Sequence, residues 1–361
     1  MYPLLTTDLS KIEHNARTLV ELCQAKDIGI IGVTKGCLGS ERIARAMLSA
    51  GVRGIGDSRL ASLLELAKAK ITPLMMLRQP MTDEVEEVVK AVDISLISEL
   101  DAAVWLSRAA FSAKKEHSII LMVETGDLRE GALPHELPGL IERILDLPYL
   151  RLLGIGTNVA CLEGAPSTNN LELLLELSER IEKEFVMEIE TISGGNSSAL
   201  KLFKLGGIPG GVNQFRIGEG ILLGQDTVDY EPVEGLYQDA FVLSAEVIEV
   251  GRKGKDFSGS GSGSWRKQAV LALGRQDVAD GLLKPLTQGV EILKRSSDHL
   301  VVDLSHCAKA VKVGDILRFI PGYFAVLAAM TSPFVKKDFV AGLVGAKRPL
   351  AEINGKTVFA S

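Results

Sequence analysis

The sequence predicts an α/β protein, with a (β/α)8 barrel of the TIM type over residues 1–230 and a β-rich domain over residues 231–361. The first observation is an alternation of short apolar segments with amphipathic helical segments, which is typical of a parallel sheet with helical crossovers. The second is their number, because about eight such units from residue 28 onward fit a closed barrel. The third is the loss of helical periodicity after residue 230, where short strands and turns follow.

The strands predicted in the first region are short, apolar and bounded by turn residues. They cover residues 4–8, 28–34, 52–56, 73–77, 93–96, 118–123, 151–155, 187–192 and 212–215. The first predicted helix begins at a cap, Asp8 or Ser10, and ends at about residue 24. A second helix begins at about residue 41. The others cover residues 58–70, 82–91, 98–111, 135–145 and 169–184. The first strand, about residues 1–8, is a candidate to pack on the second domain. A doubly wound open sheet is the alternative, but Gly-x-Gly-x-x-Gly does not follow the strand at 28–34.

The second region is predicted to consist of short strands. They cover residues 241–250, 268–273, 289–293, 300–304, 315–320 and 343–344. A Ser/Gly run at 258–264 has the composition of a flexible loop, and we assign it no chemistry.

Composition and charge exclude several classes of partner. The chain has 361 residues, of which 46% are hydrophobic and 24% charged, and its net charge of −6 comes without a basic block. We therefore expect no nucleic-acid or anionic-membrane partner. The N-terminus lacks a signal-peptide pattern and no apolar stretch reaches the length of a membrane span, which predicts a cytoplasmic protein. The four cysteines lie far apart without metal-ligand spacing, so we expect reduced thiols and no metal site.

Polar residues follow several of the predicted barrel strands. They are Lys35, Arg78, the segment 124–129, Asn158, the segment 193–198 and the segment 216–220. Each has an ordinary structural interpretation when taken alone, such as a tight turn or a surface ion pair. In a parallel barrel, however, the functional groups gather at the C-terminal ends of the strands, so their shared placement favours a common site.

The strongest chemical signal lies after the last two barrel strands. The segments 193–198 and 216–220 are rich in glycine and hydroxyl side chains and precede helical turns, where backbone N–H groups and the helix dipole favour a phosphate. Lys35 ends the first barrel strand, and a buried ammonium group there is costly unless it is paired or neutralised. A phosphate site and a lysine on opposite sides of a barrel mouth suggest pyridoxal phosphate, whose aldehyde reacts with lysine.

The motifs that carry these residues resemble those of the alanine racemase family, the fold type III pyridoxal phosphate enzymes. They are Val33-Thr34-Lys35, the segment 124–131 (Glu-Thr-Gly-Asp-Leu-Arg-Glu-Gly), Asn196-Ser197, Arg216-Ile217-Gly218 and Ser297-Asp298-His299. The resemblance spans nearly the whole chain. Within the family the sequence is most similar to the ornithine racemase branch, on the segments 192–198, 237–241 and 329–333.

The resemblance implies roles for individual residues. Lys35 would bond to the cofactor and, once freed, take the α-proton of an amino acid. Arg216 would face the pyridine nitrogen, and since a guanidinium keeps its proton, the ring would remain a weak electron sink that favours α-proton exchange over transamination. The remaining cofactor contacts would come from Asn158, Asn196, Ser197, Gly218 and Glu219. Arg129 and Asp298 would contact the substrate.

One departure from the family concerns the second acid/base that racemisation requires. The family supplies it from a tyrosine in Gly-Tyr-x-Asp, whereas this chain has Arg275 in Gly-Arg-Gln-Asp at 274–277. Tyr323, His299 and Cys161 are the candidates to replace it, and Tyr323 ranks first because of its phenol. The family's tyrosine after the lysine is also missing, since Gly39 stands there.

The resemblance therefore implies a pyridoxal phosphate-dependent amino-acid racemase and a homodimer with shared active sites. Ornithine or another diamino acid is a candidate substrate, but the sequence does not choose among amino acids. One alternative is a lyase of the D-threonine aldolase or D-serine dehydratase type, although the segment 321–325 lacks the zinc ligands of those enzymes. Another is a non-catalytic pyridoxal phosphate carrier, although such single-barrel relatives lack a second domain. A third is a sugar- or phosphate-metabolising barrel enzyme in which Lys35 is structural.

Overall fold

A computed structural model describes residues 2–159, 167–254 and 265–342. The predicted strand at 343–344, the Ser/Gly run at 258–264 and Cys161 lie outside these residues. The described chain forms two compact units. The barrel unit comprises residues 12–35 and 39–237, and the sheet unit comprises residues 2–11, 36–38 and 238–342. Each unit is described by itself.

The barrel unit contains a closed barrel of eight parallel strands, as the sequence predicts. The strands are β2 (Gly29–Val33), β3 (Gly54–Asp57), β4 (Leu74–Met76), β5 (Ile94–Ile97), β6 (His117–Met122), β7 (Leu150–Gly156), β8 (Thr191–Ser193) and β9 (Gln214–Ile217). β2 pairs with both β3 and β9, which closes the barrel. The Lys35 strand and the Arg216 strand are therefore direct neighbours. The expectation that the lysine and the segment 216–220 lie on opposite sides of the barrel mouth is thus wrong, because the last strand closes the barrel on the first.

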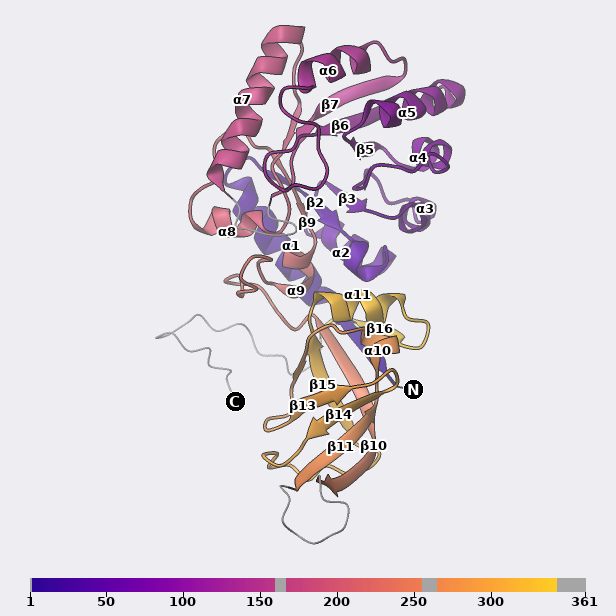
Figure 1. The fold of residues 1–361 in the computed structure, drawn as a ribbon, viewed down its shortest axis with the longest axis vertical. Helices are drawn as coiled ribbons and strands as arrows, with labels where there is room; N and C mark the ends of the chain where they lie inside the picture. The colour runs from indigo at the N-terminus through magenta and orange to yellow at the C-terminus, as the bar shows by residue number, and fades with distance from the viewer. Residues whose placement is uncertain (1, 160–166, 255–264, 343–361) are drawn as a thin grey trace. The chain divides into compact units, whose positions relative to one another are not determined.

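A helix follows each barrel strand, and the helices run along the outside of the barrel (Figure 1). They are α2 (Glu41–Ser49), α3 (Leu60–Lys68), α4 (Val85–Ala91), α5 (Leu100–Ala113), α6 (Leu137–Leu145), α7 (Thr168–Phe185), α8 (Ala199–Lys204) and α9 (Glu219–Leu223), after α1 (Leu9–Gln24) at the start of the chain. The two short helices α8 and α9 follow the strands β8 and β9, where the sequence predicts an anion site. Each begins with backbone N–H groups that lack an acceptor one turn earlier in its own helix. Several of them bond to the preceding loop instead: Ala199 to the Asn196 carbonyl, Leu200 to the Ser197 carbonyl and Gly220 to the Ser197 hydroxyl.

The interior of the barrel is a packed apolar core. Ile31 on β2, Met75 on β4, Leu96 on β5, and Ile120 and Met122 on β6 form one cluster of buried side chains. Because side chains fill the barrel, ligands reach only its ends, and the loops after the strands become the place for chemistry.

β8 is shorter than predicted. The expected strand at 187–192 is replaced by a loop as far as residue 190, and β8 begins at Thr191. The preceding segment instead closes the end of α7, where the N–H of Met187 donates to the Glu182 carbonyl and the N–H of Ile189 donates to Glu182 Oε1 (2.9 Å). Residues 187–190 therefore cap the end of α7, although their apolar content alone predicts a strand.

The sheet unit is a mostly antiparallel sheet with the strand order β12-β15-β10-β11-β14-β13. Its strands are β10 (Phe241–Lys253), β11 (Arg266–Ala272), β12 (Leu283–Pro285), β13 (Glu291–Arg295), β14 (His299–Asp303), β15 (Ile316–Pro321) and β16 (Lys336–Val340). β1 (Leu4–Asp8) joins this sheet, antiparallel to β10 and parallel to β16. The β-rich second region predicted by the sequence is thus confirmed.

Two helices of the sheet unit are absent from the sequence prediction. α10 (Arg275–Val278) is a single turn, and α11 (Tyr323–Thr331) is apolar on nearly all sides. A helix without a polar face leaves no 3.6-residue alternation in the sequence, which explains why α11 escapes a periodicity argument.

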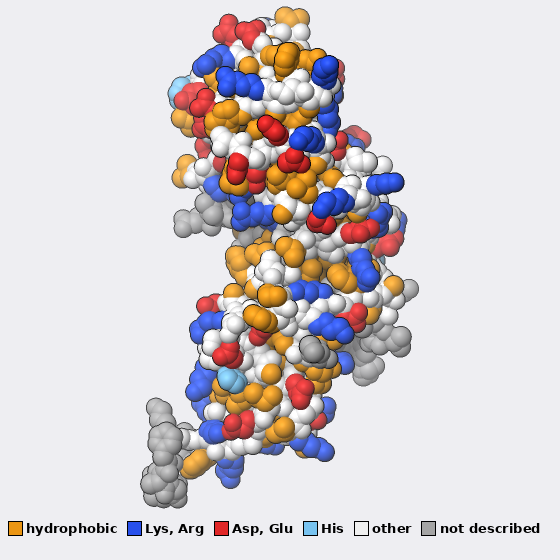
Figure 2. Space-filling view, turned by 90° about the vertical axis from the view of Figure 1, so that its right-hand side faces the viewer, with side chains coloured by type: hydrophobic (Ala, Val, Ile, Leu, Met, Phe, Trp, Pro, Cys, Tyr) orange, Lys and Arg blue, Asp and Glu red, His pale blue; other side chains and the backbone are white. Residues whose placement is uncertain are grey.

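The described residues include no helix that is both long enough and apolar enough to cross a membrane. On the face shown in Figure 2, acidic and basic side chains are interspersed over both units. This face therefore carries no broad basic surface of the kind that binds a phosphate backbone.

Candidate active site

Lys35 leaves the C-terminal end of β2. The strand is buried along its whole length, and the chain then turns through one 3-10 turn, Lys35–Cys37, which leaves the Lys35 side chain exposed. The residue before it, Thr34, is fully buried, and its N–H donates to the Gly56 carbonyl on β3 (2.9 Å). The lysine is thus mounted on a rigid strand end.

The loop between β8 and α8 is held by its own polar side chains. Asn196 Oδ1 accepts a hydrogen bond from the Ser198 N–H (2.7 Å), and the Ser198 hydroxyl donates to the Val159 carbonyl. Gly195 has φ +130°, a backbone conformation that side-chain-bearing residues rarely adopt. The turn into α8 therefore depends on glycine at this position.

The starts of α8 and α9 are joined by one serine. Ser197 Oγ accepts a hydrogen bond from the Gly220 N–H (3.2 Å), and a side chain added at Gly220 would meet Leu200 Cδ1 at 2.6 Å. Two helix starts therefore converge, each with N–H groups that have no acceptor within its own helix. Such a convergence favours an anion.

The start of α9 also lies against the lysine strand. A Cβ built on Gly218 would come within 3.0 Å of Val33 Cβ and 3.2 Å of the Val33 carbonyl oxygen, so the two strand ends are closely packed. Burial raises the pKa of the Glu219 carboxyl, while a hydrogen bond from Gln225 Nε2 (2.9 Å) and the charge of Lys35 act in the opposite direction. Glu219 and Lys35 therefore share one electrostatic environment.

Arg216 is a buried arginine at the centre of a cross-strand network. Its Nη2 donates to the Thr157 carbonyl (2.6 Å) and to Asn158 Oδ1 (3.1 Å), both after β7. Its Nη1 donates to the hydroxyl of Ser193 on β8, and Ser193 Oγ in turn donates to Gln214 Oε1 (2.8 Å). The guanidinium is thus fixed by the ends of two neighbouring strands.

The network continues into the loop after β6. Asn158 Nδ2 donates to Glu130 Oε1 (3.1 Å), and Arg129 forms ion pairs with Glu130 (3.3 Å) and with the buried Asp127 (3.2 Å). The predicted residues Arg129, Asn158 and Arg216 are therefore connected through Glu130. This single chain of contacts spans the loops after β6 and β7 and reaches β9.

The remaining predicted residues lie in the sheet unit. Tyr323 is the first residue of α11, half-buried, with its ring edge-on to Phe324 at 5.7 Å between centroids. Asp298 lies in the turn between β13 and β14 and accepts hydrogen bonds from Gln276 Nε2 and from the Ser297 hydroxyl (3.0 Å). The structure does not bring these two residues together with Lys35 inside one unit.

Arg275, which stands where the resemblance places a tyrosine, makes structural contacts. It opens α10, its Nε donates to Asp280 Oδ1 (2.7 Å), and its Nη1 donates to the Arg295 carbonyl (2.8 Å). These bonds hold its guanidinium against neighbouring parts of the sheet unit. They support the view that Arg275 does not replace the missing tyrosine chemically.

The barrel unit fits pyridoxal phosphate. The converging starts of α8 and α9, with the hydroxyl of Ser197 between them, offer N–H donors for a dianionic phosphate. The adjoining strand presents an exposed lysine amine for the aldehyde, and Arg216 offers a fixed cation for a ring nitrogen. Phosphate donors, amine and cation all lie at the same end of one barrel.

The partners of four residues in the site escape sequence reasoning. Glu130 bridges Arg129 to Asn158, the hydroxyls of Thr125 and Thr157 hydrogen-bond each other (2.7 Å), and Asp57 binds Thr34. Asp57 ends the strand β3 and Thr157 follows β7, which is a weak signal. Their partners depend on the register between neighbouring strands, which a single sequence does not contain.

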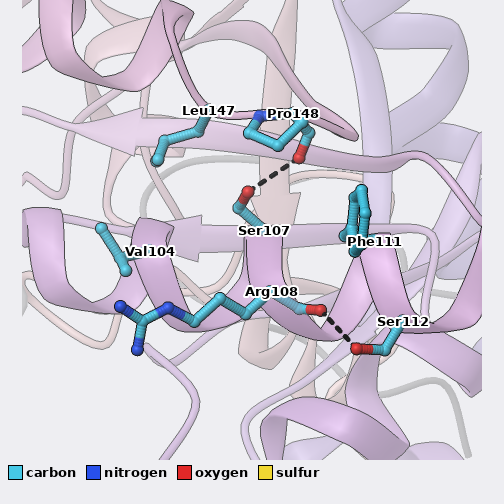
Figure 3. A pocket seen from close by; sticks show the side chains of 7 residues that line it. All are labelled: Val104, Ser107, Arg108, Phe111, Ser112, Leu147 and Pro148. Atoms are coloured by element: carbon cyan, nitrogen blue, oxygen red, sulfur yellow. Dashed lines mark hydrogen bonds between the residues drawn. The ribbon is translucent and has the colours of Figure 1, made fainter.

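A surface hollow of about 490 Å³ lies elsewhere on the barrel unit (Figure 3). It is lined by Val104, Ser107, Arg108, Phe111, Ser112, Leu147 and Pro148. These residues come from α5 and from the segment before β7, so the hollow lies toward the N-terminal ends of the strands, away from Lys35. It takes no part in the site described above.

Comparisons with known proteins agree with this geometry. The profile of the alanine racemase N-terminal domain matches residues 7–225. The chain is 40% identical to a lysine racemase of Thermotoga maritima over 353 residues, covering 94% of this chain and 99% of that protein. It is 38% identical to an ornithine racemase of Acetoanaerobium sticklandii over 354 residues, covering 94% and 100%.

Solved structures share the two-part fold. An alanine racemase from Streptomyces coelicolor superposes with a TM-score of 0.75 at 18% identity, covering 93% of this chain and 97% of that one. A D-threonine aldolase from Filomicrobium marinum gives 0.74 at 17% identity, covering 91% and 90%. At these identities the likeness concerns the fold alone, whereas the profile match and the two racemases show the family: the chain belongs to the alanine racemase family.

Proposed function

We propose that this protein is a pyridoxal phosphate-dependent racemase that interconverts the L and D forms of a diamino acid such as lysine or ornithine. The observation that carries the proposal is the position of Lys35 just after β2, a strand that pairs with β9 and packs against the start of α9. The two similar full-length proteins named lysine racemase and ornithine racemase support the substrate class.

The bound cofactor would supply an electron-withdrawing ring that makes the α-hydrogen of an attached amino acid acidic. Lys35 would hold it covalently through Nζ and then act as the base on one face of the substrate. Asn196 would order the phosphate loop, and the Ser197 hydroxyl with the amides of Gly218 and Glu219 would bind the phosphate. The resemblance assigns these roles, and the hydrogen bonds that order the loop and join the two helix starts support them.

Arg216 would face the ring nitrogen and hold it unprotonated, because its guanidinium only donates. Its bonds to Thr157 and Asn158 fix its direction in the folded protein. A ring that does not gain a proton withdraws fewer electrons, which favours return of the α-proton over side reactions. Arg129, tied to the same network through Glu130, would orient the substrate carboxylate.

Racemisation also needs a proton donor on the face opposite Lys35. We assign this role to the phenol of Tyr323 and a substrate contact to Asp298, both in the sheet unit. The assignment rests on the resemblance, in which the second domain of one subunit completes the site of another. This assignment requires a homodimer. We also propose that the protein acts in the cytoplasm.

The lyase alternative shares the fold with the D-threonine aldolase named above, but Gly322, Tyr323 and Phe324 stand where that class has zinc ligands. The carrier alternative does not account for the whole sheet unit. The two racemases match both units over at least 99% of their own length. Racemisation is therefore the function that the chain supports best.

The first test concerns Lys35. The purified protein is expected to show a visible absorbance band of bound pyridoxal phosphate, and borohydride is expected to fix the cofactor to the peptide that contains Lys35. Lys35→Ala should abolish both signals. Lys11 forms an ion pair with Asp239 in the sheet unit, so Lys11→Ala is the matched control and should keep both signals. A reducible adduct that survives Lys35→Ala would contradict the assignment.

A further inference from the structure

Glu130 lies where the loop after β6 meets the residues that follow β7. Its Oε1 accepts a hydrogen bond from Asn158 Nδ2 (3.1 Å) and pairs with Arg129 Nη2 (3.3 Å). The other end of the same amide, Asn158 Oδ1, accepts a hydrogen bond from Arg216 Nη2 (3.1 Å). Glu130 is therefore connected to the buried guanidinium of Arg216 by a direct contact at each step, all within the barrel unit.

The charges around Arg129 do not balance. Asp127 and Glu130 both pair with this one guanidinium, so the three side chains together are negative. The Asp127 side chain is 2% exposed, whereas the Glu130 side chain is 32% exposed, so Glu130 carries the accessible carboxylate. Among the described residues, none donates a hydrogen bond to Glu130 Oε2, because its recorded contacts all end on Oε1. An ionised oxygen with free acceptor capacity suits a cationic donor.

Other carboxyl groups at this end of the barrel are less suited to a cation. Glu124 accepts backbone N–H groups of its own loop with both of its oxygens. Asp226 accepts two backbone N–H groups of the turn that follows it (2.8 and 2.9 Å). Burial raises the pKa of Asp57 and that of Glu219, which disfavours the charged form of each. Glu130 thus combines exposure, an oxygen without a donor and excess negative charge.

We propose that Glu130 is a specificity-determining residue, whose Oε2 accepts the distal ammonium group of a diamino-acid substrate. This inference rests on the proposed function, because it names the side chain that recognises the substrate class of that site. Arg129 and Glu130 then offer a cation and an anion side by side to a substrate that carries both a carboxylate and a second ammonium group. A neutral amino acid of the same length lacks the donor and gains nothing from Glu130.

The test measures α-deuterium exchange for two substrate pairs that differ only in the distal amine, L-ornithine with L-norvaline and L-lysine with L-norleucine. Glu130→Gln removes the charge and keeps an oxygen for Asn158 Nδ2, so the network to Arg216 is preserved. Loss of a charge-assisted hydrogen bond should lower the ratio of kcat/KM between the diamino acid and its neutral partner by about tenfold to a hundredfold. The KM for ornithine and that for lysine should rise, because the contact is made in the bound substrate as well as in the transition state.

Asp127→Asn is the matched control, since Asp127 is the other carboxylate paired with Arg129 and its side chain is buried. It should affect diamino and neutral amino acids to the same extent and keep the wild-type ratio. Glu130→Asp retains the charge and withdraws it by one methylene group. Because lysine is one methylene longer than ornithine, Glu130→Asp should raise the kcat/KM for lysine relative to that for ornithine several-fold.

A Glu130→Gln protein with the wild-type ratio and the wild-type KM for ornithine overturns the proposal, and so does an equal fall of the ratio in Asp127→Asn. If Glu130→Gln does not fold, Glu130→Asp decides, and an unchanged preference between lysine and ornithine there also overturns it. In each of these cases the wild type still exchanges a diamino acid, so the proposed function stands. A wild-type protein that exchanges no amino acid overturns the proposed function and the role of Glu130 with it.

Discussion

The close packing between the start of α9 and the end of β2 can be probed at Gly218. Its φ of −115° suits any residue, so Gly218→Ala adds a methyl group without backbone strain. That methyl would lie 3.0 Å from Val33 Cβ, 3.2 Å from the Val33 carbonyl oxygen and 3.3 Å from Val33 Cγ1. Val33 would have to shift by a few tenths of an ångström to accept this methyl group. Because Val33 lies in a strand that is buried along its whole length, we expect an overpacking cost of about 1–3 kcal/mol.

Gly139 in α6 provides the matched control. A methyl group there meets nothing within 4 Å, so Gly139→Ala should gain about 0.5–1 kcal/mol from helix propensity. The two variants are therefore expected to move the free energy of unfolding in opposite directions. Urea unfolding followed by circular dichroism measures the difference, and dialysis followed by the visible band measures cofactor retention.

Gly218→Ala should lose cofactor faster than the wild type, because its methyl group separates the anion site from Lys35. Gly139→Ala should retain cofactor as the wild type does. The packing argument fails if Gly218→Ala unfolds at the wild-type urea concentration and keeps its cofactor equally well.

Three further predictions concern Arg216, Arg275 and His117. Arg216→Lys should destabilise the protein by about 1–3 kcal/mol in urea unfolding, because one ammonium nitrogen cannot reach all the acceptors that the guanidinium now binds. Arg275→Ala should leave the visible cofactor band intact in an absorbance scan, because its contacts are to Asp280 and a backbone carbonyl. Burial lowers the pKa of His117 from 6.5 to about 4, so the unfolded chain binds the proton first as the pH falls. Stability should therefore decline between these two values, by about 2 kcal/mol at a pH near 5, in urea unfolding at several pH values.

Controls for these predictions are present in the chain. The exposed His135 serves for His117, since His135→Gln should leave the acid-side loss of stability unchanged whereas His117→Gln should reduce it. An unchanged pH slope in His117→Gln would contradict the linkage. A stable Arg216→Lys would contradict the network, and loss of the cofactor band in Arg275→Ala would show that this arginine belongs to the site.

The sequence predicts the barrel because short apolar strands alternate with amphipathic helices in about eight units. The same argument misses α11, because its apolar residues leave no periodic pattern. It also misplaces the start of β8, because the residues before β8 hydrogen-bond to Glu182 and cap α7. Local patterns therefore give the order of elements but not each boundary.

Local sequence patterns do not predict which side chains contact each other between neighbouring strands. The bridge from Arg129 through Glu130 to Asn158, and the bond from Thr34 to Asp57, depend on which strand ends meet at the same height in the barrel. The register in which β2 pairs with β3 and with β9 determines which residues of these strands lie at the same level in the barrel. Motif resemblance supplies candidate residues at the strand ends, and only the folded barrel supplies their partners.

Proton exchange at the α-carbon tests the central claim most directly. The protein would be incubated with L-lysine and L-ornithine in deuterium oxide, with L-alanine and L-serine alongside, and analysed by chiral chromatography and mass. We predict α-deuterium in both enantiomers of a diamino acid, and no exchange in Lys35→Ala. Keto acid or aldehyde products, or a visible cofactor band without exchange in either diamino acid, would contradict the account.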